Sequence, residues 1–64
     1  MPSELQLAEV VREACMRAAF EAYESAGISG LCTEGRWELA VQAIRILDLE
    51  SVINGVQNPV EPDR

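Results

Sequence analysis

The apolar and polar positions between residues 4 and 26 follow the pattern of one long amphipathic helix. This stretch is rich in alanine and contains neither glycine nor proline, a composition that favours helix. Ser3 and Gln6 have the spacing of a capping box, in which each side chain bonds the backbone amide of the other residue. We therefore expect a helix that begins at Ser3 and ends at Gly27, with Gly27 in the left-handed conformation.

At about 100° per residue, two apolar stripes run along this helix. The first is a seam rich in small residues, made of Leu7, Val10, Val11, Ala14, Cys15, Ala18 and Ala22. The second lies on the charged side of the helix and consists of Met16, Phe20 and Tyr23. The alanines of the seam allow another helix to approach closely, but one partner helix cannot cover both stripes.

The segment GRWELAVQAIRILDL predicts a second helix that is apolar over more than half of its circumference. Its apolar positions are Trp37, Leu39, Ala40, Val41, Ala43, Ile44, Ile46 and Leu47. A helix of this kind normally lies at the centre of a bundle. Because 64 residues supply too few other elements to surround it, we expect a second copy of the chain to cover it. The predicted interface residues of that homodimer are Met16, Phe20, Tyr23 and Trp37.

The connection between the two helices leaves two alternatives open. Ser29 and Thr33 can each cap the second helix, so its start lies between Gly30 and Glu34. Inside the first turns of that helix, Gly35 costs about 1 kcal/mol relative to alanine. A close crossing with the first helix at Gly35 would explain this cost, and the other possibility is an exposed glycine in the first turn.

Asp48 can cap a short third helix over LESVIN, which we expect to end at Gly55. The segment after it contains two prolines and little apolar surface, which is typical of a flexible tail. The sequence therefore predicts an all-α protein with a single domain over residues 1–56 and a flexible C-terminal tail over residues 57–64. Its fold is a helical hairpin plus a short third helix, dimerising into a helical bundle.

Composition and charge exclude several classes of function. Eleven acidic residues oppose five arginines, for a net charge of −6, which repels nucleic-acid phosphates and anionic membranes. The segment ESAGIS resembles the turn of a helix-turn-helix DNA reader, but Glu34 and Gly35 occupy positions where base-reading side chains should lie. No apolar run approaches the roughly 20 residues of a membrane span, and the N-terminus lacks a signal-peptide pattern. We expect a cytoplasmic protein that binds neither nucleic acid nor membrane.

The absence of histidine removes the commonest general base and the commonest metal ligand. Without a CxxC motif, the two cysteines do not predict a zinc site, and we expect no metal or cofactor. A disulfide between Cys15 and Cys32 is geometrically possible across the hairpin, although a reducing compartment disfavours it. The candidate ligand-binding residues are Cys32, a reactive thiol near a helix start, and Arg36, which with the first amides of that helix could bind an anion.

The block AYESAGISGLCTEGRWE resembles a set of very short bacterial proteins of unassigned function, some automatically labelled acetyltransferase, with an AYExAG(I/L)xGLCxEGxWE core. The resemblance implies a bacterial origin and a compact helical fold. Acetyl transfer from coenzyme A in its usual fold needs a mixed sheet, a pyrophosphate-binding loop and a deep pocket, and this chain predicts no strand. We expect a non-catalytic interaction or regulatory protein, with an unidentified protein partner beyond the homodimer. The alternative is a small-ligand binder or enzyme that uses Cys32 and Arg36.

Overall fold

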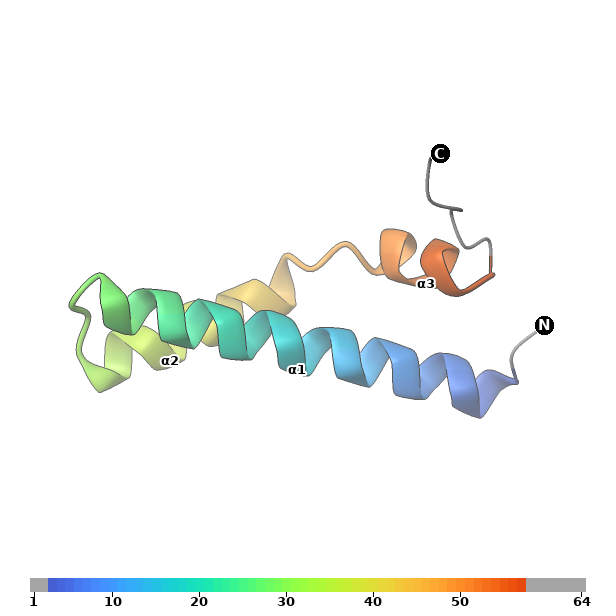
Figure 1. Cartoon of the computed structure of the whole chain (residues 1–64), viewed down its shortest axis with the longest axis horizontal. Helices are drawn as coiled ribbons and strands as arrows, with labels where there is room; N and C mark the ends of the chain where they lie inside the picture. Colours follow the sequence, from blue (N-terminus) through green and yellow to red (C-terminus); the bar gives the residue numbers. More distant parts are fainter. Residues whose placement is uncertain (1–2, 58–64) are drawn as a thin grey trace, which may run out of the picture.

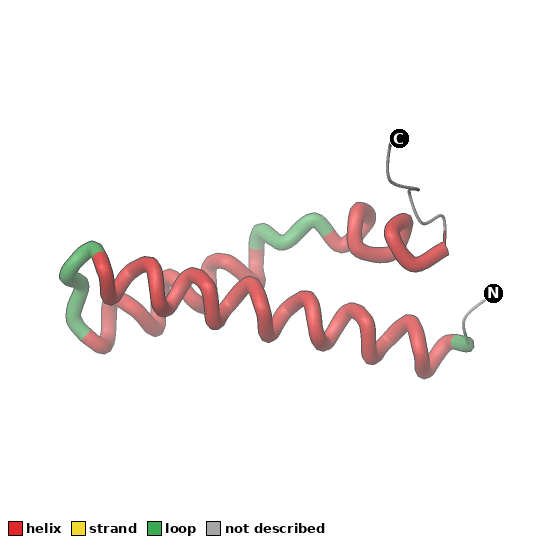
Figure 2. Tube along the Cα trace, in the orientation of Figure 1, coloured by secondary structure: helices red, strands yellow, loops and turns green. Residues whose placement is uncertain are grey.

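The computed structural model describes residues 3–57, which form three helices (Figures 1 and 2). They are α1 (Glu4–Ile28), α2 (Thr33–Arg45) and α3 (Leu49–Gln57). After a tight turn, α2 runs back along the C-terminal half of α1, and α3 lies beside its N-terminal half. The predicted all-α fold, with a packed hairpin and a short third helix, is confirmed. Residues 58–64 of the predicted tail lie outside the described residues.

The start of α1 is the predicted capping box. The Gln6 amide donates to Ser3 Oγ at 3.1 Å, and the Ser3 amide donates to Gln6 Oε1 at 2.9 Å. Two otherwise unsatisfied amides at the helix N-terminus are thereby bonded within the chain.

The prediction that α1 ends at a left-handed Gly27 is wrong, because the helix continues to Ile28 and the positive φ of +92° belongs to Gly30. The Leu31 amide donates to the Ala26 carbonyl and the Gly30 amide to the Gly27 carbonyl, each at 3.0 Å. These two bonds form a Schellman motif with Gly30 as its left-handed residue. The turn therefore comes three residues later than predicted.

The start of α2 at Thr33 falls within the predicted range, but neither predicted cap is used. The N-cap is Cys32, whose side chain makes no capping hydrogen bond. Of the two alternatives for Gly35, the close crossing with α1 is wrong, and the glycine is half-buried rather than exposed. A β-carbon at Gly35 would lie 3.1 Å from Leu31 Cδ2, because Leu31 folds over the first turn of α2.

The predicted cap of α3 is confirmed. Asp48 Oδ2 accepts a hydrogen bond from the Ser51 hydroxyl at 2.9 Å, and its Oδ1 accepts one from the Ser51 amide at 3.2 Å. Both bonds favour the charged carboxylate and lower the pKa of Asp48. The expected end at Gly55 is wrong, since α3 runs to Gln57. Val56 is half-buried, and its burial extends the helix beyond the glycine.

The core of the described part of the chain consists of two small side chains, Ala26 and Ala40, which are the buried residues among positions 3–56. The predicted seam of α1 is half-buried throughout, as expected for the side of α1 that α2 and α3 cover. Many large apolar side chains stay exposed: Leu5, Met16, Phe20, Ile28, Trp37, Leu39, Ile44, Ile46 and Leu49. Within residues 3–57, no helix has the length and apolar character needed to cross a membrane.

Candidate interaction surface

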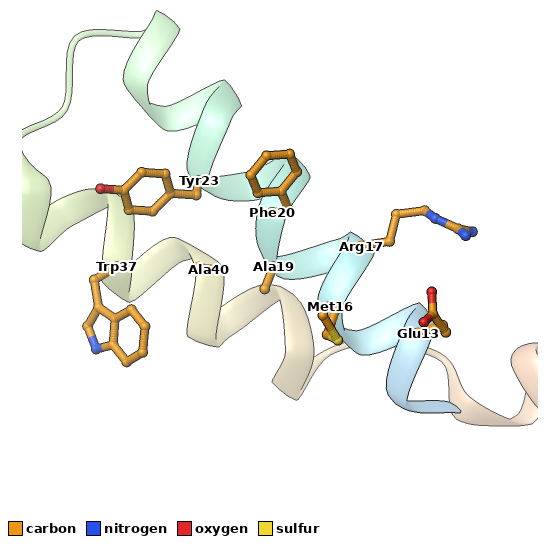
Figure 3. A pocket seen from close by; sticks show the side chains of 8 residues that line it. All are labelled: Glu13, Met16, Arg17, Ala19, Phe20, Tyr23, Trp37 and Ala40. Carbon is orange, nitrogen blue, oxygen red and sulfur yellow. The ribbon is translucent and has the colours of Figure 1, made fainter. Parts of the chain in front are cut away.

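Four predicted interface residues lie on one surface, which we call the aromatic face: Met16, Phe20, Tyr23 and Trp37. They line an open depression of about 550 Å³ between α1 and α2. Figure 3 shows Tyr23 and Trp37 at one end of this depression, Met16 at the other, and Phe20 between them on α1. The remaining lining residues are Glu13, Arg17, Ala19 and Ala40. The structure thus brings all four residues together, and their role as an interface stays a prediction.

The helical period explains how the aromatic face forms. Met16, Phe20 and Tyr23 are spaced i, i+4 and i+7, which places them along one side of α1. The hairpin then brings Trp37 beside Tyr23, since both residues line this depression and an adjoining one. Met16, Phe20 and Trp37 are 61%, 65% and 63% exposed. An apolar surface so open to water is typical of a site that another molecule covers.

The outer edges of the aromatic face carry charges that form no ion pair within residues 3–57. On α1, Arg17 lies on the side of the depression away from Trp37 (Figure 3). On α2, Glu34, Trp37 and Glu38 line the adjoining depression of about 410 Å³ together with Tyr23. Within residues 3–57 the ion pair present joins Arg12 Nη1 to Glu9 Oε2, at 3.4 Å on the exposed surface of α1.

The acidic edge of α2 was not identified from sequence. Glu34 and Glu38 are one turn apart, a like-charge spacing that weakly destabilises an isolated helix. Their spacing around Trp37 was a usable signal, since residues three and four apart share a helix face. Ile44, which is 42% exposed, was recognised as apolar but was not assigned to the interface.

The guanidinium of Arg36 is engaged within the protomer. Its Nε donates to the Leu31 carbonyl at 3.1 Å, and its Cζ lies 5.6 Å from the centre of the Tyr23 ring. A β-carbon at Gly27 would lie only 2.9 Å from this Cζ. Arg36 therefore connects the turn and α2 to α1, and Gly27 permits the close approach of the Arg36 guanidinium to the backbone of α1.

Cys32 and Arg36 do not form a common site. Arg36 lines an adjoining depression of about 500 Å³ that shares Phe20 and Tyr23 with the aromatic face and extends towards Ile28, and Cys32 is not among its lining residues. The thiol of Cys32 is exposed at the N-cap of α2, and Glu34 lies in the same turn. Cys15 is half-buried, and both thiols are free. In the described part of the chain, no group of three or more acidic or cysteine side chains is placed to hold a metal ion.

Comparison with known proteins gives no relative: no family model, curated protein or solved structure matches this chain.

Proposed function

We propose that this chain is a non-catalytic interaction protein that self-associates through the aromatic face into a homodimeric helical bundle. The observation that carries the proposal is the exposure of Met16, Phe20 and Trp37, each above 60%, around one depression. A second copy of the chain presents the same surface, so a two-fold axis would let the two faces cover each other.

The small core of the protomer supports this proposal. Hydrophobic burial is the main stabilising term in folding, and the buried side chains among residues 3–56 are two alanines. Chains of this size commonly need a disulfide, a metal or oligomerisation to be stable. Both thiols are free and the described residues offer no metal-binding cluster, which leaves association as the favoured source of additional stability.

The chemistry of the aromatic face also suits association. Aromatic residues and methionine are enriched in the centres of protein interfaces, where charged side chains are depleted. Here two aromatic residues and Met16 occupy α1, the indole of Trp37 adds a third aromatic group from α2, and charged side chains lie at the edges. Catalysis or ligand binding at Cys32 and Arg36 has less support, because the Arg36 guanidinium is bonded to the Leu31 carbonyl.

Size-exclusion chromatography with light scattering tests the proposal on two matched variants. Phe20→Ser removes an apolar side chain that is 65% exposed on the aromatic face. Ile46→Ser removes one that is 69% exposed but lines a different depression, beside Leu39 and Ala43. We expect Phe20→Ser to convert dimer to monomer and Ile46→Ser to stay dimeric. Equal behaviour of the two variants would show that the aromatic face is not the interface.

A further inference from the structure

We infer that the two-fold axis of the dimer passes level with Phe20 on α1 and with Val41 on α2, and that Arg17 of each protomer pairs with Glu24 of the other. This inference rests on the proposed self-association. It adds the register and the ion pairs that would select a second copy of this chain over other apolar partners.

The first step is the order of residues along α1. Residues in a helix rise by about 1.5 Å each, so Arg17 lies about 4.5 Å before Phe20 and Glu24 about 6 Å after it. A perpendicular two-fold axis at Phe20 runs the two copies of α1 antiparallel and brings Arg17 to within about 1.5 Å, measured along the helix, of the level of the partner's Glu24. The same axis places Phe20 against its own symmetry mate, and Met16 against the partner's Tyr23.

The second step is the position of these residues around α1. Arg17 and Glu24 are seven residues apart, which at about 100° per residue is about 20° of rotation. They therefore share one edge of the stripe formed by Met16, Phe20 and Tyr23. Figure 3 shows that Arg17 lies on the side away from Trp37. A two-fold axis perpendicular to both α1 helices places this edge of one protomer against the same edge of the other. Each Arg17 therefore lies next to the partner's Glu24.

The same axis gives matching contacts on α2. Ala40 lines the depression together with Phe20, so the axis crosses α2 near Ala40 and Val41. Trp37 and Ile44 are both exposed and lie seven residues apart. The axis then sets Trp37 of each protomer against Ile44 of the other. Glu38 and Arg45 have the same spacing at the outer edge of α2, so the axis sets Glu38 level with the partner's Arg45.

The charges therefore distinguish this register from its neighbours. Arg17 and Arg45 have no ion pair within the part of the chain that the structure describes, and one axis supplies a carboxylate to both. Moving the axis one turn towards Met16 also moves it by one turn on α2, from Val41 to Arg45, and sets the two copies of Arg45 level with each other, so like charges then meet at the edge of α2. Edge charges of this kind set register and partner choice more than total affinity.

Charge-reversal variants test the inference, with their dissociation constants measured by sedimentation equilibrium at low ionic strength. Glu24→Arg places two arginines opposite each other in each of the two symmetry-related pairs, and we expect it to raise the dissociation constant about tenfold. Glu21→Arg is the matched control, since it makes the same change in net charge at an exposed position on α1 that lines neither the depression of the aromatic face nor the depression that Glu24 lines beside Arg36. It should leave the dissociation constant within about twofold or lower it, because the chain becomes less acidic.

The double variant Arg17→Glu with Glu24→Arg restores opposite charges across the axis, and we expect its dissociation constant to return to within about threefold of the parent. The register is refuted if Glu24→Arg binds no more weakly than Glu21→Arg, or if the double variant fails to recover. If the parent chain is dimeric, those outcomes refute the register but not the proposed self-association. A parent chain that is monomeric throughout refutes both.

Discussion

The contact between Gly27 and Arg36 predicts that the effect of Gly27→Ala on stability depends on whether the Arg36 side chain is present. Replacing Gly27 by alanine in the last turn of α1 should stabilise the helix by up to about 1 kcal/mol from propensity alone. The new methyl group would, however, lie 2.9 Å from Arg36 Cζ and 3.0 Å from its Nη1. The guanidinium must then move away from Gly27.

The cost of that movement follows from what Arg36 contacts. Its hydrogen bond to the Leu31 carbonyl is 3.1 Å long and part-buried, and hydrogen bonds with a charged partner contribute about 1.5–3 kcal/mol. The stacking on Tyr23 adds about 0.5–1 kcal/mol at an exposed site. Because Arg36 is only half-buried, solvent compensates part of the loss, and we expect a cost of about 1–2 kcal/mol.

A double-mutant cycle separates the two effects. In the parent, Gly27→Ala should leave stability unchanged or lower it by up to about 1 kcal/mol, whereas in an Arg36→Ala background it should raise stability by about 1 kcal/mol. Urea unfolding followed by circular dichroism measures all four proteins at one fixed concentration, because association also contributes to stability. A coupling energy below about 0.5 kcal/mol, the usual limit of additivity, would show that Gly27 and Arg36 do not constrain each other.

Three further predictions follow from single residues. Gly35→Ala should keep or raise the melting temperature, since the new methyl group meets the movable tip of a leucine side chain 3.1 Å away; a clearly lowered midpoint would show that the first turn of α2 is rigidly packed. The lowered pKa of Asp48 stabilises the fold above the usual aspartate pKa of about 3.9 and loses that effect as the pH falls through the lower folded value. Parent and Asp48→Asn should therefore converge in melting temperature as the pH is lowered, and a constant difference would exclude this charge effect. A thiol reagent under native conditions should label the exposed Cys32 faster than the half-buried Cys15. The reverse order would show that Cys15 does not lie on the half-buried seam of α1.

Signals that act within one turn of the chain were readable from the sequence. The hydroxyl of Ser3 and the carboxylate of Asp48 cap the helices that follow them, as their positions predict. The stripe of Met16, Phe20 and Tyr23 also followed from the helical period alone. In each case the relevant residues lie within about two turns of one another, so no knowledge of the tertiary arrangement was needed.

The turn between α1 and α2 could not be placed in this way, because Gly27 and Gly30 are both acceptable helix-ending residues. The choice depends on Arg36, a side chain of the next helix that occupies the space beside Gly27. Cys32 is the N-cap of α2, although a thiol is not among the preferred caps. The spacing of Glu34 and Glu38 around Trp37 was readable from the sequence, but their position next to Tyr23 of α1 depends on how α2 packs beside α1.

Sedimentation equilibrium of the unmodified chain, from low micromolar to near-millimolar concentration, tests self-association through the aromatic face most directly. The protomer mass is 7.0 kDa. We predict a concentration-dependent rise of the mass to twice that value, with the emission of Trp37 shifting to shorter wavelength over the same range as its exposed indole becomes covered. A mass that stays at 7.0 kDa throughout, with unchanged Trp37 emission, would contradict it.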